Sequence, residues 1–542
     1  MSENWNEKGI IDVLIIGAGP TGLTAAVECL RLGLKVRLVE RKQQRQSNQS
    51  RALVVHSRTL EQLPMSIAKR LSEDCLPMTI MNYKVGRNKA PFEIHTEGYW
   101  MDNLDWPYVA GLAQYDTERI IEEGMKKQGG IVEWGKSVVS AVQEGGYVFT
   151  NVEDESNGGK ETIKSKWLIG CDGGRSITRK EAGIGFERNT GELFAMADFK
   201  VQKPLPFKGF YLSLHYDGIA GLFPLPSENN TYRAFLQPPE GFKENNLDPA
   251  FLQNIVTKRT GMDISPLSSS DISWLTAFRA VYALSESHRH KNIFLAGDAV
   301  HLHSPIGGQG MNYGIQDAIN LTWKLAWAKR YLLKAAMNNT NDESANDNVN
   351  NIIFDSYEAE RRPLAKALVK NTNRGMYFAS IKNPIFKFLR NMIFRIMIYF
   401  NIMPKLITNS ISMLDLAYTD PSPILFTSAK SQKYYLCKNG ERMPNLKTTK
   451  GEPLYHCIDR TRHSFVMVHS SLSTVDDYEI FMEDEGPGGL SLLHIVVPSK
   501  KKLKSHAILV RPDLYVAAVG DTLSDIWEMV GKKIGVDARD CM

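Results

Sequence analysis

The sequence predicts an α/β fold that opens with a Rossmann-like βαβ unit. The run at 10–16 is rich in β-branched and aliphatic residues, as expected of a buried strand, and the glycine-rich segment 17–22 follows it at once. Residues 23–32 have helical spacing, and a second apolar run at 35–39 ends at Glu40. A strand, a helix and a second strand within about 30 residues make one βαβ unit.

Length and composition indicate a globular protein with more than one domain. The chain has 542 residues, of which 43% are hydrophobic and 23% are charged. Its 65 Lys and Arg residues against 60 Asp and Glu give a net charge of +5, without a dense basic cluster. We therefore expect no nucleic-acid partner.

Cysteine usage and the apolar segments bear on location. The six cysteines are scattered and form no Cys-x-x-Cys pair, which predicts reduced thiols in a cytoplasmic protein with no metal site. The polar N-terminus does not resemble a secretory signal. The stretch 386–406 contains Arg390 and Arg395 and is closed by Pro404. We interpret it as an amphipathic helix packed on the protein, without stable membrane insertion; the alternative is a membrane-surface helix.

Further elements follow along the chain. A strand at 166–170 runs into a second glycine-containing segment, and alternation between 199 and 235 predicts an antiparallel sheet. A third strand at 292–296 leads into Gly297-Asp298, and a long helix is expected at about 310–333. These elements extend the α/β prediction beyond the first unit.

The C-terminal part is predicted to form a separate small α/β domain. The asparagine-rich segment 338–351 is expected to be a solvated loop, and helices are expected from 352 to about 416. Residues 418–423 resemble a linker. Beyond it, the sequence predicts four strands at 464–468, 494–498, 507–511 and 514–519 and a helix at 522–533.

The first glycine motif predicts a dinucleotide site. Gly17 permits a tight turn, Gly19 lets the backbone approach a pyrophosphate, and Gly22 lets the helix pack on the strand. The phosphates would then meet free N–H groups at the helix N-terminus. Glu40, at the end of the second strand, can accept hydrogen bonds from a ribose hydroxyl. The motif alone does not distinguish NAD from FAD.

Two later segments carry a resemblance to a known family. Gly170-Cys-Asp-Gly-Gly-Arg-Ser and the run from Gly297-Asp298 to Gly310-Met-Asn312 are similar to motifs of the single-component FAD-dependent aromatic hydroxylases, the class of para-hydroxybenzoate and phenol hydroxylases. The resemblance covers about residues 8–375. Segments 440–445 and 509–513 resemble the subgroup that appends a thioredoxin-like domain lacking the redox cysteines.

The resemblance implies a domain division. It implies a Rossmann-like FAD-binding domain at 8–190 plus 285–375, with part of the substrate region near 60–110. An inserted antiparallel-sheet substrate domain would occupy 191–284. A helical connection at 376–423 would lead to the thioredoxin-like domain at 424–542.

The resemblance also implies FAD-binding residues. The three motif glycines would hold the pyrophosphate and Glu40 the adenosine ribose, with Arg51 reaching the phosphates and Gln114 the ribityl chain. Asp172 and Arg175 would serve both FAD and NAD(P)H, Asp298 would bond the ribityl chain or the adjoining ribose, and the segment from Gly307 would lie along the flavin ring. The full expected set is Gly17, Gly19, Pro20, Gly22, Glu40, Arg41, Arg51, Gln114, Asp172, Arg175, Asp298, Pro305, Gly307, Gly308, Gly310, Met311 and Asn312. Structural alternatives are open for several of them: Arg51 as a surface residue, Gln114 as a helix cap and Asp172 as a residue that pins the following turn.

The implied activity is an NAD(P)H- and O2-dependent hydroxylation. Members of the family reduce FAD with NAD(P)H and transfer oxygen to a phenolic or polycyclic aromatic through a flavin C4a-hydroperoxide. NADH and NADPH are not distinguished by this sequence. The alternatives are epoxidation or Baeyer–Villiger oxidation, and, in another class, a non-catalytic FAD-binding protein. Whether the chain forms a homodimer is left open.

The residue that activates the substrate is not identified by sequence. Five residues are candidates for the substrate pocket solely because they lie in the strands of the substrate region: Tyr211, His215, Phe223, Arg233 and Tyr282. The alternation places Tyr211 and His215 on one face of the sheet. His56, His301 and His303 are interpreted as packing or backbone-bonding residues.

Overall fold

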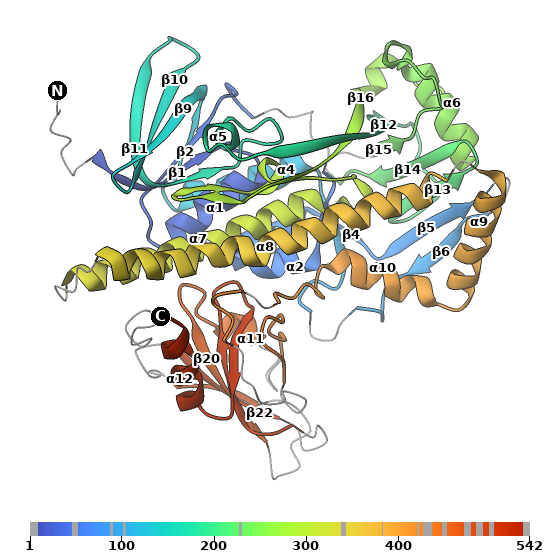
Figure 1. The fold of residues 1–542 in the computed structure, drawn as a ribbon. Helices are drawn as coiled ribbons and strands as arrows, with labels where there is room; N and C mark the ends of the chain where they lie inside the picture. Colours follow the sequence, from blue (N-terminus) through green and yellow to red (C-terminus); the bar gives the residue numbers. More distant parts are fainter. Residues whose placement is uncertain are drawn as a thin grey trace.

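The computed structural model describes most of the chain. The described ranges are 9–45, 52–86, 90–100, 104–226, 230–337, 343–381, 383–419, 422–426, 436–446, 453–470, 479–483, 491–497 and 503–534. Three large sheets and two long helices dominate the architecture (Figure 1). Among the described helices, none combines the length and the apolar character needed to cross a bilayer.

The first sheet contains the βαβ unit. Its order is β17 (Arg289–His290), β18 (Ile293–Leu295), β11 (Lys160–Gly170), β1 (Ile11–Ile16), β2 (Val36–Glu40) and β8 (Val132–Trp134), with β10 (Tyr147–Asp154) pairing β11 and β9 (Lys136–Glu144). Strand β1 is parallel to both β2 and β11, and β11 is parallel to β18. The carboxyl ends of these strands therefore meet at one edge of the sheet.

Helices cover this sheet and form the main core. They include α1 (Pro20–Arg31), α4 (Gln114–Lys127), α7 (Gly310–Met337) and α8 (Glu343–Ala379). The core contains the fully buried tryptophans Trp323 and Trp327 of α7. Three short helices, α2 (Ser57–Gln62), α3 (Met65–Asp74) and α5 (Ile177–Glu181), complete this part of the molecule, together with a small sheet of β3 (Val54–Val55), β7 (Val109–Gly111) and β4 (Leu76–Met78). Every residue of α2 is buried.

The second sheet is mostly antiparallel. Its order is β19 (His301–Leu302), β16 (Ile272–Ser285), β12 (Phe186–Lys200), β15 (Thr231–Leu236), β14 (Gly218–Pro224), β13 (Phe210–His215), β5 (Ile80–Val85) and β6 (Phe92–His95). One face packs against α6 (Pro249–Thr260). The other face packs in part against α9 (Pro384–Tyr399) and α10 (Ile402–Ser412), at the end of the molecule shown at the right of Figure 1.

The third sheet forms the C-terminal unit below the long helices (Figure 1). Its order is β21 (Glu479–Glu483), β22 (Ser491–Val497), β20 (Ser464–Ser470), β23 (His506–Val510) and β24 (Val516–Gly520), flanked by α11 (Leu454–Cys457) and α12 (Leu523–Ile534). The four strands and the terminal helix expected from the sequence are confirmed; β21 was not anticipated.

Two local expectations are corrected by the structure. The predicted loop 338–351 is helical from Glu343 onward, because Val349 and Ile353, four residues apart, pack together in the main core and extend α8. Pro404 does not close the helical segment, since it lies in the first turn of α10, where proline is tolerated. The break between α9 and α10 is at Asn401, whose φ is +53°.

Candidate functional site: a dinucleotide edge facing an aromatic sheet

The three glycines of the first motif have different environments. Gly17 has a φ of +100°, and a Cβ on it would lie 2.5 Å from the carbonyl oxygen of Cys171. A Cβ on Gly22 would lie 1.8 Å from the carbonyl oxygen of Gly17. Packing within the protein therefore requires glycine at both positions.

Gly19 is not required by the protein itself. Its φ is −76°, which any residue adopts, and no protein atom lies within 4 Å of where a Cβ would be. It is the N-cap of α1, no side chain caps this end in the structure, and Pro20 occupies the first turn. The amides of that turn and the open approach over Gly19 fit a pyrophosphate, so the local structure fits a bound dinucleotide.

Glu40 organises the glycine turn. Its carboxylate accepts hydrogen bonds from the N–H of Ala18 at 2.8 Å and of Lys42 at 3.1 Å. A carboxylate offers about four acceptor positions, so capacity for a ribose hydroxyl remains. The neighbouring Arg41 is exposed. Arg51 lies outside the described residues.

The first and third motifs meet at Thr21 of α1. A Cβ on Gly297 would lie 2.6 Å from the Thr21 hydroxyl oxygen, and a Cβ on Gly314 of α7 would lie 2.3 Å from it. The second motif joins them through Cys171, which contacts Gly17. Segments separated by nearly 300 residues thus converge at the carboxyl edge of the first sheet.

Asp298 and Gln114 are placed near this edge by different elements. Asp298 is exposed in a short 3₁₀ turn, Gly297–Ala299, directly after β18. Gln114 begins α4; its amide nitrogen donates to Glu118 at 2.7 Å, and its side-chain oxygen accepts from the N–H of Ala52 at 3.4 Å. Gln114 therefore packs beside the segment that leads back to Arg51, and the N-cap of α4 is Ala113 rather than Gln114.

Asp172 is engaged within its own turn. Its carboxylate accepts from the Ser176 hydroxyl at 2.5 Å, from the N–H groups of Ile177 and Thr178 at 2.8 and 3.0 Å, and from the Thr178 hydroxyl at 3.1 Å. These bonds fix the start of α5, in agreement with the structural alternative for this residue. Arg175, in the same turn, is exposed.

Hydrogen bonds and a close contact attach the loop from Pro305 to Asn312 to β3. Asn312 is fully buried; its side chain accepts from the N–H of His56 at 2.9 Å and donates to the carbonyls of Val54 and Gly308, both at 3.0 Å. Gly308 has a φ of +60°, and a Cβ on it would lie 2.4 Å from Cγ2 of Val54. Asn312 and Gly308 therefore hold the loop in place through β3.

The neighbours in this loop have distinct positions. Pro305 precedes the 3₁₀ turn Ile306–Gly308, within which Gly307 has a φ of +80°. Gly310 begins α7, and a Cβ on it would lie 3.0 Å from Nε2 of His303. Met311, the next residue, packs against the main core.

The three histidines of this region are enclosed. Burial lowers the pKa of His56 to about 4, and its Nε2 lies 3.0 Å from the carbonyl oxygen of Gly307. Burial and the neighbouring His301 lower the pKa of His303 to about 4. His301 is fully buried and lies 2.9 Å from Asp317, which also binds Arg361 at 2.6 Å. These contacts agree with packing and backbone-bonding roles.

The second sheet divides the substrate-pocket candidates between its faces. Tyr211 and His215 lie on the α6 face: the Tyr211 hydroxyl donates to the carbonyl of Thr260 at 3.2 Å, and His215 accepts from the N–H of Asp217 at 3.2 Å. Both side chains therefore lie on the side of the sheet that α6 covers. Alternation groups residues on a face but does not indicate which face meets the cofactor side.

Phe223 and Arg233 lie on the other face, directly opposite each other on β14 and β15. Arg233 is 2% exposed and forms a two-pronged ion pair with Asp198 of β12, at 2.5 and 2.6 Å. Its guanidinium carbon lies 5.0 Å from the ring centre of Trp274, and one of its nitrogens is 3.4 Å from the carbonyl of Ala52. This face is thus aromatic with one neutralised charge pair.

An apolar cluster joins this face to the glycine loop. It contains Leu53, Val54 and Met78, with Phe210 and Phe223 packed against it. Because Val54 also meets Gly308, the aromatic face and the Pro305–Asn312 loop contact the same cluster. Tyr282 lies at another border of the loop: its hydroxyl donates to Glu192 at 3.1 Å, and burial raises its pKa.

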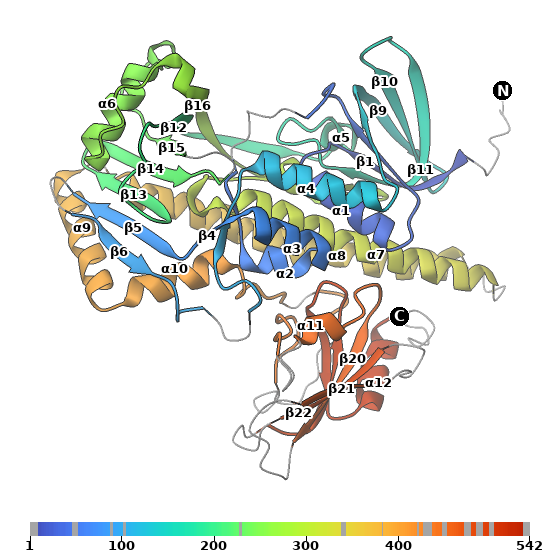
Figure 2. The same ribbon diagram turned by 180° about the vertical axis from the view of Figure 1, so that it is seen from behind.

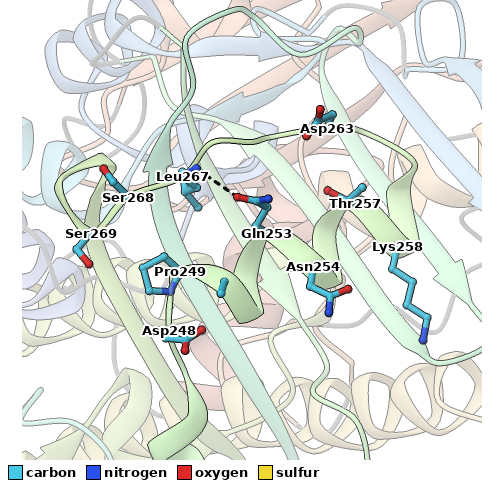
Figure 3. A pocket seen from close by; sticks show the side chains of 11 residues that line it. Asp248, Pro249, Gln253, Asn254, Thr257, Lys258, Asp263, Leu267, Ser268 and Ser269 are labelled. Carbon is cyan, nitrogen blue, oxygen red and sulfur yellow. Dashed lines mark hydrogen bonds between the residues drawn. The ribbon is translucent and has the colours of Figure 1, made fainter.

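An open groove elsewhere is unrelated to this edge. It has a volume of about 710 Å³ and lies between α6 and the segment 263–269 (Figure 3). Gln253, Asn254, Lys258 and Ser268 line it, and the N–H of Leu267 donates to Gln253 at 3.2 Å. Most of the residues that line the groove are polar, and it lies on the α6 side of the second sheet, opposite the side of Phe223 and Arg233.

Comparisons with known proteins define the class. The FAD binding domain family matches residues 10–372, and the chain belongs to this family. Two curated relatives are a 6-methylpretetramide 4-monooxygenase of Streptomyces rimosus, 30% identical over 69% of this chain and 63% of the relative, and a rifampicin monooxygenase of Rhodococcus hoagii, 26% identical over 98% and 99%. The chain thus spans less than two thirds of the first relative and nearly all of the second. The solved structure of an anhydrotetracycline hydroxylase from Streptomyces rimosus matches with a TM-score of 0.71 and 25% identity, over 97% of this chain and all of the other.

The family assignment and the edge geometry agree. The protein is an FAD-dependent monooxygenase, an oxidoreductase whose bound cofactor is FAD. The resemblance stated from its motifs is confirmed, as is the α/β architecture of that family.

Proposed function

We propose that the protein hydroxylates a phenolic or polycyclic aromatic substrate, using NAD(P)H and O2. The observation that carries the proposal is the position of Val54, which links the glycine loop to the aromatic face bearing Phe223. An aromatic substrate between them would contact ring faces on one side and the cofactor side on the other. Relatives named for anhydrotetracycline, rifampicin and pentachlorophenol support an aromatic substrate.

The proposed FAD ligands follow from the edge. The open backbone over Gly19 and the first turn of α1 would hold the pyrophosphate, Glu40 the adenosine ribose, and Asp298 with Gln114 the sugar-alcohol chain. The segment 307–312 would lie along the ring. When bound, FAD supplies the redox chemistry of the reaction.

The chain's own residues would position the cofactor and shield the reaction from water. Asn312 anchors the loop through three hydrogen bonds, which would position the backbone that is proposed to lie beside the ring. The N-terminus of the 28-residue helix α7 points its dipole toward this loop and favours negative charge there. The apolar cluster around Leu53 and Val54 excludes water from the same place.

Arg233 is proposed to orient the substrate rather than to carry free charge. Asp198 neutralises its guanidinium through two hydrogen bonds, and the pair is nearly buried. A buried pair of this kind can present a polar contact to a phenolic oxygen without placing a net charge in the pocket. Tyr282, beside the loop, is the second proposed contact.

The C-terminal unit is proposed to be a thioredoxin-like domain without redox function. In support, β20 and β22 are parallel, β23 and β24 extend the sheet antiparallel, and α12 follows them. Cys437 and Cys457 are both free thiols. We further propose domain limits at residues 190, 284, 375 and 423, a homodimer and a cytoplasmic location.

The test is NAD(P)H oxidation by the purified holoenzyme under air, with simple phenols and tetracyclic aromatics as substrates. We expect oxidation to accelerate with one aromatic class and a hydroxylated product to form. Products carrying an epoxide or an inserted ester oxygen would favour the alternative oxygenations. A yellow protein that consumes no NAD(P)H with any substrate would favour a non-catalytic FAD-binding protein.

A further inference from the structure

The outer side of α9 and α10 is apolar and exposed. Most of the large apolar side chains that are exposed in the described part of the chain lie between 377 and 406. Phe388 is 62% exposed, Tyr399 81% and Phe400 65%. The others are Tyr377, Phe378, Ile385, Phe386, Leu389, Met392, Ile393, Ile396, Ile402 and Leu406. Both views place these helices at the end of the molecule remote from β9 and β10 (Figures 1 and 2).

The inner side of α9 holds polar groups. Arg390, only 2% exposed, donates to the carbonyl of Ala379 and to the side-chain oxygen of Asn391, which is also buried. Arg395 donates to the carbonyl of Val85 at 3.0 Å, and Lys387 to that of Tyr216 at 2.6 Å. The helix therefore turns charged groups toward the protein and apolar groups outward, the reverse of an ordinary surface helix.

This reversal is stable because the protein supplies acceptors. Backbone carbonyls and Asn391 satisfy the inward cations, while Phe394 and Met397 pack on the second sheet. An exposed apolar face of this extent is uncommon on a soluble surface and marks a partner of apolar chemistry. A second feature of the segment identifies that partner.

The segment is strongly basic. From Pro363 to Leu414 the sequence contains eight Lys or Arg residues and no Asp or Glu. Lys366, Lys370 and Arg374 are exposed on α8 and share one helix face with Tyr377, by their spacing of four, four and three residues. Three of the eight, on α9, bond inward, and the exposed Lys366, Lys370 and Arg374 therefore flank the apolar side chains, with no acid between 363 and 414.

We propose that α9, α10 and the last turns of α8 dock the protein onto the surface of an anionic lipid bilayer. Aromatic and aliphatic side chains with flanking Lys and Arg residues suit the boundary between head groups and acyl chains. A second copy of the chain fits less well, because a two-fold interface would bring each basic face against its own copy. The inner side of α9 stays on the protein, so the helix lies along the membrane.

The surface adjoins the proposed aromatic site without depending on it. Phe210 packs both against the cluster beneath α9, which contains Met81, and against the cluster that contains Val54. A substrate dissolved in the lipid would thus lie near the aromatic sheet face. The docking itself rests on the exposed side chains and the charge pattern alone.

Vesicle flotation of the full-length holoenzyme tests the proposal. We expect binding to vesicles of phosphatidylcholine mixed with phosphatidylglycerol, at least about tenfold tighter than to phosphatidylcholine alone and weakened by added salt. The variant Phe388→Ser/Ile393→Ser should lower the affinity at least about tenfold, since two apolar side chains leave the lipid. The matched control Val139→Ser/Val142→Ser alters two valines of β9 that are 53% and 56% exposed, and should bind as wild type does.

A charge-reversal pair separates lipid from protein partners. Lys366→Glu/Lys370→Glu should weaken binding to anionic vesicles by more than about tenfold, at roughly fivefold for each cation lost, whereas Lys203→Glu/Lys243→Glu, at exposed sites elsewhere, should not. Retained FAD in each variant verifies the fold. Absence of binding to both vesicle types would overturn the proposal. A second result would also overturn it: wild type forms a dimer in light scattering, does not bind vesicles, and is converted to a monomer by Phe388→Ser/Ile393→Ser. The apolar face would then join two copies of the chain.

Discussion

Arg511 and Glu360 form a two-pronged ion pair in the interior, with nitrogen–oxygen distances of 2.7 and 2.9 Å and both side chains 0% exposed. Lys324 donates to the same Glu360 at 2.8 Å, and Asp513 binds Arg511 at 2.6 Å. Burial alone would raise the pKa of Glu360, but Arg511 and Lys324 hold it well below its usual value. The charges of two cations and two carboxylates thus cancel where the third sheet meets α7 and α8.

Removing Arg511 should destabilise the protein severely. Arg511→Met leaves the carboxylates of Glu360 and Asp513 in a buried site with Lys324 as the remaining cation, which costs about 3–5 kcal/mol of unfolding free energy. Arg462→Met is the control, because Arg462 is 48% exposed and pairs with Asp459 at 3.2 Å, a contact worth under about 1 kcal/mol. Urea unfolding compares them. Equal losses in the two variants would contradict a special role of the cluster.

Stability should fall as the pH falls below about 6.5, the usual pKa of histidine. His463 lies against Trp323 and Trp327, and burial lowers its pKa to about 3. Between these values the unfolded chain binds a proton that the folded chain does not, so the free energy of unfolding declines by up to about 1.4 kcal/mol per pH unit for this group.

The variant His463→Phe should remove this contribution and flatten the decline. Urea unfolding at several pH values between about 6.5 and 4.5 gives the slope. His290→Phe, at an exposed position, is the control and should keep the wild-type slope. An unchanged slope in His463→Phe would show that His463 does not contribute to the acid sensitivity.

Gly19→Ala should fold but lose FAD. No protein atom opposes the added methyl group, so the apoprotein should unfold as wild type does, within about 1 kcal/mol. The methyl group would occupy the approach proposed for the pyrophosphate. The measurement is the absorbance of bound flavin after gel filtration, together with the melting temperature. Gly9→Ala, which also meets no atom within 4 Å, should retain FAD; full retention in Gly19→Ala would remove this glycine from the site.

Gly308 and Val54 should behave as a coupled pair. In Gly308→Ala the new methyl group meets Cγ2 of Val54 at 2.4 Å and φ is +60°, so both contact and backbone strain oppose it. Val54→Ala removes the contact but not the strain. A double-mutant cycle on melting temperature should therefore show that Gly308→Ala costs less when Val54 is already Ala. Additive losses would show that the two residues do not touch.

Thiol chemistry should be dispensable for turnover. Burial raises the pKa of Cys437 far above its usual range, so the thiolate is not formed near neutral pH. Cys437→Ser and Cys457→Ser should each retain the wild-type rate of NAD(P)H oxidation. A large loss in either variant with FAD content preserved would indicate electron transfer through the C-terminal unit.

Local patterns in the sequence anticipated the βαβ unit closely. Strand 10–16 is β1 at Ile11–Ile16, and the predicted glycine turn is at the expected place, because a β-branched run followed by closely spaced glycines has few alternative structures. The convergence of the Gly297 segment on Thr21 was implied only by the family resemblance. Contacts between segments this far apart leave no local signal.

The sequence did not indicate which face of the second sheet lies on the cofactor side. Alternation grouped Tyr211 with His215 correctly, but the choice of face depended on where α6 packs, which is a tertiary property. The same applies to Arg390, whose position in an apolar helix suggested an interruption although the structure buries it against backbone carbonyls. The cluster of Arg511 with Glu360 likewise joins residues 151 positions apart.

The buried helix α2 connects the C-terminal unit to the order in which the chain is made. Arg58 of α2 donates to the carbonyl of Asp513 at 3.1 Å, and Arg442 donates to the carboxylate of Glu61. A growing chain on the ribosome would therefore hold these early charges, and Glu360 after them, without their later partners until residues 442 to 513 have emerged. We infer that the interior around α2 and α8 completes its packing only after that point of synthesis, so the nascent chain carries unpaired interior charges until then.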